Sequence, residues 1–196
     1  MGAIAVRLLG AALTQREGRA AGIAADLRVA IRLNAAIGEF AMRLSASSMS
    51  PESVRRLALL LRVARYYDTV AELASDLAGA GAESDAHAPA ASALTAGLDE
   101  FSNHVTRLLL LADPLAADDA TRVLDRELPL LEERYQSLKA MLLAAGANGE
   151  ISIPGMDLLL RQASLARRSA TQAFKAARLL GKTAEPGQGA ITMTTG

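Results

Sequence analysis

Apolar residues recur at intervals of three and four along most of this 196-residue chain, which is the pattern of amphipathic helices. Between residues 23 and 44, charged residues separate the apolar positions Ile23, Leu27, Ala30, Ile37, Ala41 and Leu44. Alanine and leucine together supply 74 of the residues, and both favour helices. No stretch has the pattern of a strand, so we expect an all-α fold.

Turn and capping residues divide this pattern into helices. Ser50-Pro51-Glu52 has the form of a helix beginning, with a capping serine, a proline in the first turn and an acidic residue after it. Ser152 begins the last helix in the same way, and Gly181 is its expected C-cap. A short apolar segment at 3–14 precedes helices over about 23–44, 51–79, 94–111, 118–145 (with Pro129 as a kink) and 153–180.

The two halves of the chain resemble each other. At an offset of 102 residues, Ser50 matches Ser152, Ala64-Arg65 matches Ala166-Arg167, and Thr69 matches Thr171. This repeat predicts one domain over 1–181, made of a first unit at 1–81, a linker at 82–91 and a second unit at 92–181. The remaining segment, 182–196, has the composition of a disordered tail.

Composition and charge exclude several classes of function. Twenty-one basic residues balance 21 acidic ones, so the chain has no general field to attract nucleic acid or an anionic membrane. It has no cysteine for a disulfide or a thiolate site, and an aromatic content of 3% argues against binding single strands by stacking. No apolar run reaches the roughly 20 residues of a membrane span. The composition also fits the soluble part of a longer membrane protein.

Three carboxylates, those of Asp68, Glu72 and Asp76, follow one another at four-residue steps and therefore share a helix face. Oxygen ligands of this kind suit a hard cation, so the three residues form a weak candidate site for one weakly bound divalent cation, and we expect no other cofactor. The simpler interpretation is a solvated acidic stripe, partly offset by Arg65 one turn earlier.

The two histidines give no sign of a metal or catalytic site. His87 lies in the linker, and His104 lies in a helix near Asp99 and Glu100. Neither has a second histidine or a cysteine at ligand spacing, so we expect a surface or hydrogen-bonded histidine in each case. Paired carboxylates in different surroundings, which acid–base catalysis requires, are also missing, so we expect no enzyme.

Basic residues gather in the last helix, and acidic residues gather in the helix before it. Either the two helices neutralise each other, or the basic face contacts anionic lipid headgroups or a partner. The candidate face consists of Arg161, Arg167, Arg168, Lys175 and Arg178, and the acids at 118–133 are Asp118, Asp119, Asp125, Glu127, Glu132 and Glu133.

The segment at 50–73, with Arg-Tyr-Tyr-Asp at 65–68, resembles the third helix of a PhoU-like domain, and the segment at 37–45 is similar to the end of that family's second helix. The likeness is strongest to the cytoplasmic C-terminal domain of sodium/phosphate (Na/Pi) cotransporter family proteins. It implies two pseudo-symmetric three-helix bundles, six helices in all, with the first one shortened. The family's metal-binding acid is replaced by Ala64 here, and both positions are alanine (Ala166 and Ala170) in the second repeat.

The resemblance implies a non-catalytic regulatory or scaffold domain associated with sodium-dependent phosphate transport. Such a domain would lie in the cytoplasm at the inner face of the membrane. It would dock a helix face on the membrane portion of a transporter, on another transport partner or on a second copy of itself, and nucleic acid is not an expected partner. The alternative is an independent, all-helical protein-interaction module with no role for metal or phosphate.

Overall fold

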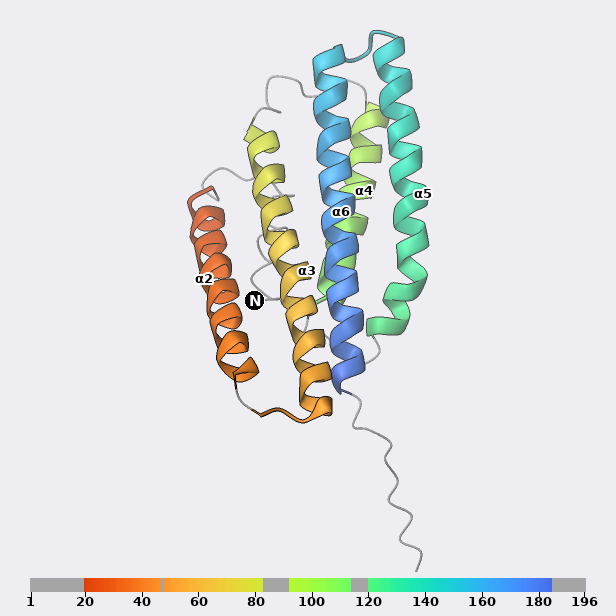
Figure 1. The fold of residues 1–196 in the computed structure, drawn as a ribbon. Helices are drawn as coiled ribbons and strands as arrows, with labels where there is room; N and C mark the ends of the chain where they lie inside the picture. Colours follow the sequence, from red (N-terminus) through yellow and green to blue (C-terminus); the bar gives the residue numbers. More distant parts are fainter. Residues whose placement is uncertain (1–19, 47, 83–91, 114–119, 185–196) are drawn as a thin grey trace, which may run out of the picture.

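The computed structural model describes residues 20–46, 48–82, 92–113 and 120–184, which form five helices and, within these ranges, no strand (Figure 1). The all-α prediction is therefore confirmed. The segment at 3–14, the linker residues 83–91 and the tail residues 185–196 lie outside the described residues. The helices are α2 (Ala20–Ser45), α3 (Pro51–Ala82), α4 (Ser92–Leu111), α5 (Ala120–Ala147) and α6 (Ile153–Ala184).

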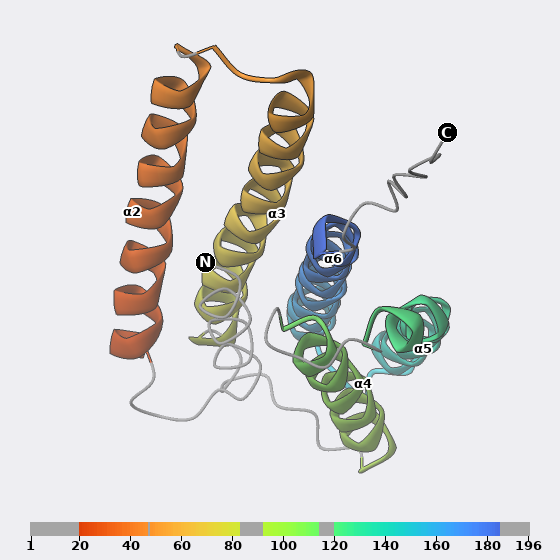
Figure 2. The same ribbon diagram turned by 90° about the horizontal axis from the view of Figure 1, so that it is seen from below.

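Successive helices run in opposite directions along one common axis (Figure 1). Seen from one end, α4, α5 and α6 form a three-cornered group, α3 lies beside α6, and α2 lies outside α3 (Figure 2). Helix α6 is central, because it packs against α3, α4 and α5, whereas α2 packs mainly against α3.

The pairing of α3 with α6 is the most extensive contact between helices. Both helices bury small side chains, which allow two helices to approach closely. One polar bond joins them as well, since the amide nitrogen of Gln162 donates to the carbonyl oxygen of Ala80 over 2.9 Å. The buried alanines are Ala64, Ala71, Ala74 and Ala80 on α3 and Ala163, Ala166, Ala170, Ala173 and Ala176 on α6.

Larger side chains fill the space between α4 and α5. Phe101, Val105 and Leu108 are buried on α4, and Leu124, Leu131 and Leu138 are buried on α5 at seven-residue steps. That spacing keeps one face of α5 turned towards its neighbours. Helix α2 differs, since Ala30 and Ala41 are its only buried apolar residues among those described. Packing therefore holds α2 least firmly.

Helices α3 and α6 begin and continue in the same way. Each has 32 residues. The hydroxyl of Ser50 accepts from the amide of Ser53 (3.1 Å), and that of Ser152 accepts from the amide of Gly155 (3.2 Å). Both predicted serine caps are therefore confirmed. Further along, the hydroxyl of Thr69 donates to the carbonyl of Arg65, and the hydroxyl of Thr171 donates to the carbonyl of Arg167.

The C-terminal end of α6 differs from the prediction. The helix continues through Gly181 to Ala184, so the expected cap at Gly181, and a tail beginning at residue 182, are wrong. A glycine inside a helix costs only about 1 kcal/mol relative to alanine, so it does not by itself end one. The described glycine with a positive φ (73°) is Gly149, which follows α5, while the amide of Glu150 donates back to the carbonyl of Ala145 over 2.9 Å.

Candidate functional site

The acidic stripe of α3 does not form a metal site in the part of the chain that the structure describes. The carboxylate of Asp68 is 3.2 Å from the guanidinium of Arg65 and is only 13% exposed, whereas Glu72 and Asp76 are exposed to solvent. No three His, Cys, Asp or Glu side chains among the described residues are grouped so that they could hold a metal ion. Asp68 is thus occupied by a neighbour on its own helix, and the three carboxylates are not brought together.

The basic residues of α6 divide into two groups. Arg161, Arg168 and Lys175 follow one another at seven-residue steps, share one face and are exposed. Their cationic groups form no ion pair with any described residue. This exposed stripe lies on α6, the helix that packs most extensively against the rest of the bundle.

The other two members of the predicted face, Arg167 and Arg178, line a groove on the α5 side of α6. A guanidinium nitrogen of Arg167 donates to the carboxylate of Glu132 over 2.8 Å, and the same guanidinium lies 4.5 Å from the ring centroid of Tyr135. Arg167 therefore joins α6 to α5 by an ion pair and by a cation–π contact.

The carboxylate of Glu132 also accepts from the side-chain amide of Gln136 over 2.7 Å. This hydrogen bond, and then the bond from Arg167, hold the pKa of Glu132 below its usual range. The prediction that the charges of α5 and α6 neutralise each other is confirmed for Glu132 and Arg167. It is wrong for Glu127, whose carboxylate faces α4. Asp118 and Asp119 lie outside the described residues.

The groove between α5 and α6 has a volume of about 400 Å³ and is lined by both charged and apolar side chains. Its apolar wall includes Leu128, Pro129 and Phe174. Because Pro129 has no amide hydrogen, it cannot donate to the carbonyl of Asp125, one turn earlier on the same wall. The groove carries acids as well as bases, so its charge does not select an anion.

A buried polar cluster between α4 and α5 was missed by the sequence analysis. Nδ1 of His104 lies 3.7 Å from a carboxylate oxygen of Glu127, and a guanidinium nitrogen of Arg107 donates to the other oxygen over 2.9 Å. Nε2 of His104 is buried and has no hydrogen-bond partner in the part of the chain that the structure describes. The spacing of the apolar residues indicates that His104 is buried, because it falls between Phe101 and Val105, which are both buried on the same face of α4.

Burial lowers the pKa of His104, against the smaller opposing effect of Glu127. The imidazole is therefore neutral at neutral pH, while Arg107 balances the charge of Glu127. The side chain of His104 is only 5% exposed, whereas that of Arg107 is 62% exposed, so the cluster extends from the α4–α5 contact to the surface. This arrangement suits a structural contact between the two helices. His87 lies outside the described residues.

Among the described helices, none is both long enough and apolar enough to cross a membrane. Comparison of the chain with known protein families, with curated proteins and with solved structures gives no match.

Proposed function

We propose that this chain is a non-catalytic docking domain that works as a regulator or scaffold through an exposed helix face. The observation that carries the proposal is the stripe of Arg161, Arg168 and Lys175 on α6, exposed and without acidic partners among the described residues. Helix α6 is also the most extensively packed helix. Because neighbouring helices hold α6 in place, its exposed face presents these charges at fixed spacing. Fixed spacing favours recognition of a complementary acidic surface.

The second part of the proposal is a duplicated, PhoU-like architecture. Its support is the matching of α3 with α6, since two helices of equal length have serine caps and threonine hydroxyl bonds at the same offset of 102 residues. In this arrangement α2 and α3 belong to one three-helix unit, and α4, α5 and α6 form the other.

From the resemblance of the segment at 50–73 to PhoU-like domains, we further propose that the docking partner belongs to sodium-dependent phosphate transport. The partner would be the membrane portion of a Na/Pi cotransporter or a protein that accompanies it. The domain would then act at the cytoplasmic face of the membrane, and a second copy of the chain is the other candidate partner.

The experiment that tests docking is co-purification with a Na/Pi cotransporter from the same genome, using the intact chain and the double variant Arg161→Glu with Arg168→Glu. Reversing two charges of the stripe should lower the retained amount by about tenfold. The matched control, Arg28→Glu with Arg32→Glu, changes two exposed arginines of α2 and should leave retention unchanged. Equal retention of both variants would contradict docking through α6.

The link to phosphate needs a separate readout. Uptake of labelled phosphate should change when the chain is deleted, and the Arg161→Glu, Arg168→Glu variant should fail to restore it. If uptake is unaffected by deletion, the chain is instead an interaction module without a role in phosphate transport.

A further inference from the structure

Although the chain has no net charge, its charges are separated along the bundle. Three segments lie towards one end of the bundle, with that of α3 between the other two, and we call them the basic end: residues 36–45 of α2, 51–65 of α3 and 172–181 of α6 (Figure 1). Their acidic residues are Glu39 and Glu52 alone. Their basic residues are Arg43, Arg55, Arg56, Arg62, Arg65, Lys175 and Arg178.

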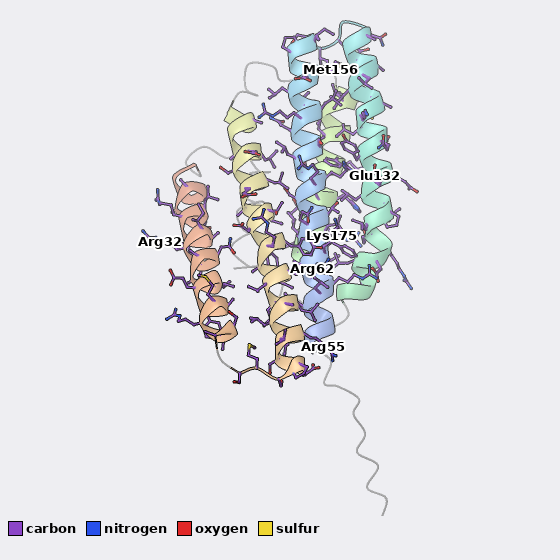
Figure 3. All side chains as sticks on the ribbon, in the orientation of Figure 1. Arg32, Arg55, Arg62, Glu132, Met156 and Lys175 are labelled. Carbon is purple, nitrogen blue, oxygen red and sulfur yellow. The ribbon has the colours of Figure 1, made fainter. Side chains whose placement is uncertain are left out.

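The arrangement of helices brings these charges together. Helices α3 and α6 run in opposite directions, so the beginning of α3 lies beside the end of α6 (Figure 1). Arg55, Arg62 and Lys175 accordingly lie in the same half of the bundle, and Met156, near the beginning of α6, lies at the opposite end (Figure 3).

The acidic residues of the basic end do not cancel its charge. Glu39 pairs with Arg43 at 3.9 Å and Glu52 pairs with Arg55 at 3.7 Å, both on the surface. Arg56, Arg62 and the two α6 cations have no ion pair with a described residue. The basic end therefore keeps a surplus of positive charge.

The same end exposes large apolar side chains. Five of them, on the last turns of α2 and the first turns of α3, are between 36% and 66% exposed: Phe40, Met42, Val54, Leu60 and Leu61. Isolated exposed apolar residues are normal, but these five lie on the same two segments as most of the arginines, and exposed apolar side chains near cations favour an interaction surface.

We propose that the basic end binds the surface of an anionic lipid bilayer, with its apolar side chains entering the headgroup layer and its arginines and lysine contacting lipid phosphates. Apolar side chains flanked by cations are the combination that interfacial membrane binding uses. The charge complementarity favours lipid, and a fluid headgroup layer adapts to side chains that project from two helices. A protein partner would need a matching hollow.

This inference deepens the proposed docking function, on which it rests for its setting beside a membrane, and it concerns a surface that shares only Lys175 with the docking stripe. The stripe at Arg161 and Arg168 stays available for a protein partner while the basic end contacts lipid. The neutrality of the whole chain argues against a general attraction to an anionic membrane. The basic end is locally positive, so that argument does not apply to it.

The test is sedimentation of the purified full chain with vesicles of phosphatidylcholine alone and with vesicles that also contain phosphatidylglycerol. We expect binding only to the anionic vesicles and its loss at high salt. The double variant Arg56→Glu with Arg62→Glu should weaken the binding by about tenfold. Phe40→Ser with Met42→Ser should weaken it without removing its dependence on salt.

A matched control at the other end of the bundle changes an exposed cation and an exposed leucine of α5, by Lys139→Glu with Leu143→Ser, and should bind as the unchanged chain does. Circular dichroism of each variant verifies that it is folded. Equal binding to both vesicle types, or full binding by Arg56→Glu with Arg62→Glu, would overturn the proposal. So would self-association that Phe40→Ser with Met42→Ser abolishes in the absence of vesicle binding, since a second copy would then cover this end.

The vesicle experiment contains no transporter, and the co-purification variant Arg161→Glu with Arg168→Glu leaves the basic end intact. Failure of lipid binding would therefore leave partner docking standing. Failure of partner docking would equally leave the vesicle result in place.

Discussion

His104 and Glu127 face each other inside the α4–α5 contact, with Nδ1 of the histidine 3.7 Å from a carboxylate oxygen. Burial lowers the pKa of His104 below its ordinary value of 6.5, so the unfolded chain binds the proton more readily than the folded one. This contribution to stability is therefore fully present above pH 6.5 and is lost as the pH falls below it. Arg107 and Arg134 also face the imidazole and oppose its protonation.

We expect the free energy of unfolding to fall between about pH 7 and about pH 5, and His104→Gln to flatten that dependence because glutamine does not titrate. Urea unfolding at a series of pH values measures it. The lowered pKa of Glu132 acts at lower pH, below its usual 4.5, so it does not obscure this range. The same slope in the variant would contradict the role of His104.

Tyr67→Phe should stabilise the fold. The hydroxyl of Tyr67 is buried without a hydrogen-bond partner among the described residues, and burial together with the charge of Asp113 raises its pKa, so it stays protonated. Removing an unsatisfied buried hydroxyl should gain up to about 1 kcal/mol. Thermal unfolding measures the change, with Tyr66→Phe, at the neighbouring half-buried position, as the control. A clear loss of stability in Tyr67→Phe would show that the hydroxyl has a partner.

Arg167→Lys should weaken the attachment of α5 to α6. Lysine keeps the charge but loses the planar group that lies over Tyr135 and pairs with Glu132, so we expect a loss of about 0.5–1 kcal/mol in unfolding experiments. Arg161→Lys, on the exposed face of the same helix, should change the free energy of unfolding by less. Equal effects of the two substitutions would mean that the stacked geometry contributes nothing.

Replacing each of two glycines by alanine should change the free energy of unfolding in opposite directions. Gly149 has a φ of 73°, which alanine adopts at a cost of about 1 kcal/mol, so Gly149→Ala should destabilise the turn between α5 and α6. Gly38 lies inside α2, where a Cβ atom would meet nothing within 4 Å. Gly38→Ala should therefore stabilise by about 0.5–1 kcal/mol. Urea unfolding of both variants checks the pair, and a shared sign would contradict the assigned backbone conformations.

Calorimetric titration with calcium or magnesium should give no saturable heat for the unchanged chain. The carboxylate of Asp68 pairs with Arg65, and the exposed Glu72 and Asp76 do not join it in a group that could hold a metal. Asp68→Ala should therefore give the same trace. A saturable signal that Asp68→Ala abolishes would restore the cation site as a candidate.

The beginnings of the helices could be predicted from the sequence because their causes are local. The serines at positions 50 and 152 accept hydrogen bonds from amides three residues away, and such caps leave a signature in adjacent residues. The end of α6 was missed for the opposite reason. Whether Gly181 ends a helix depends on whether packing favours continuation, which the neighbouring residues do not reveal.

The polar cluster could not be predicted in full, because its members come from two helices. His104 was assigned to the neighbourhood of Asp99 and Glu100, yet its contact is Glu127, on the next helix along the chain. The acids of α5 were assigned to α6 as one group, but packing turns Glu132 towards α6 and Glu127 towards α4. Only the angular positions of these residues on a packed helix decide between the two neighbours.

The central position of α6 also bears on how the chain folds during its synthesis. Of the five described helices, α6 leaves the ribosome last, yet it packs against three of the other four. Until α6 has been synthesised, the apolar side chains of α3, α4 and α5 that it will cover stay exposed. Chaperones can bind these apolar faces during that time. We therefore expect the domain to complete its folding only after α6 has been translated. The earlier helices should gain little stability one at a time.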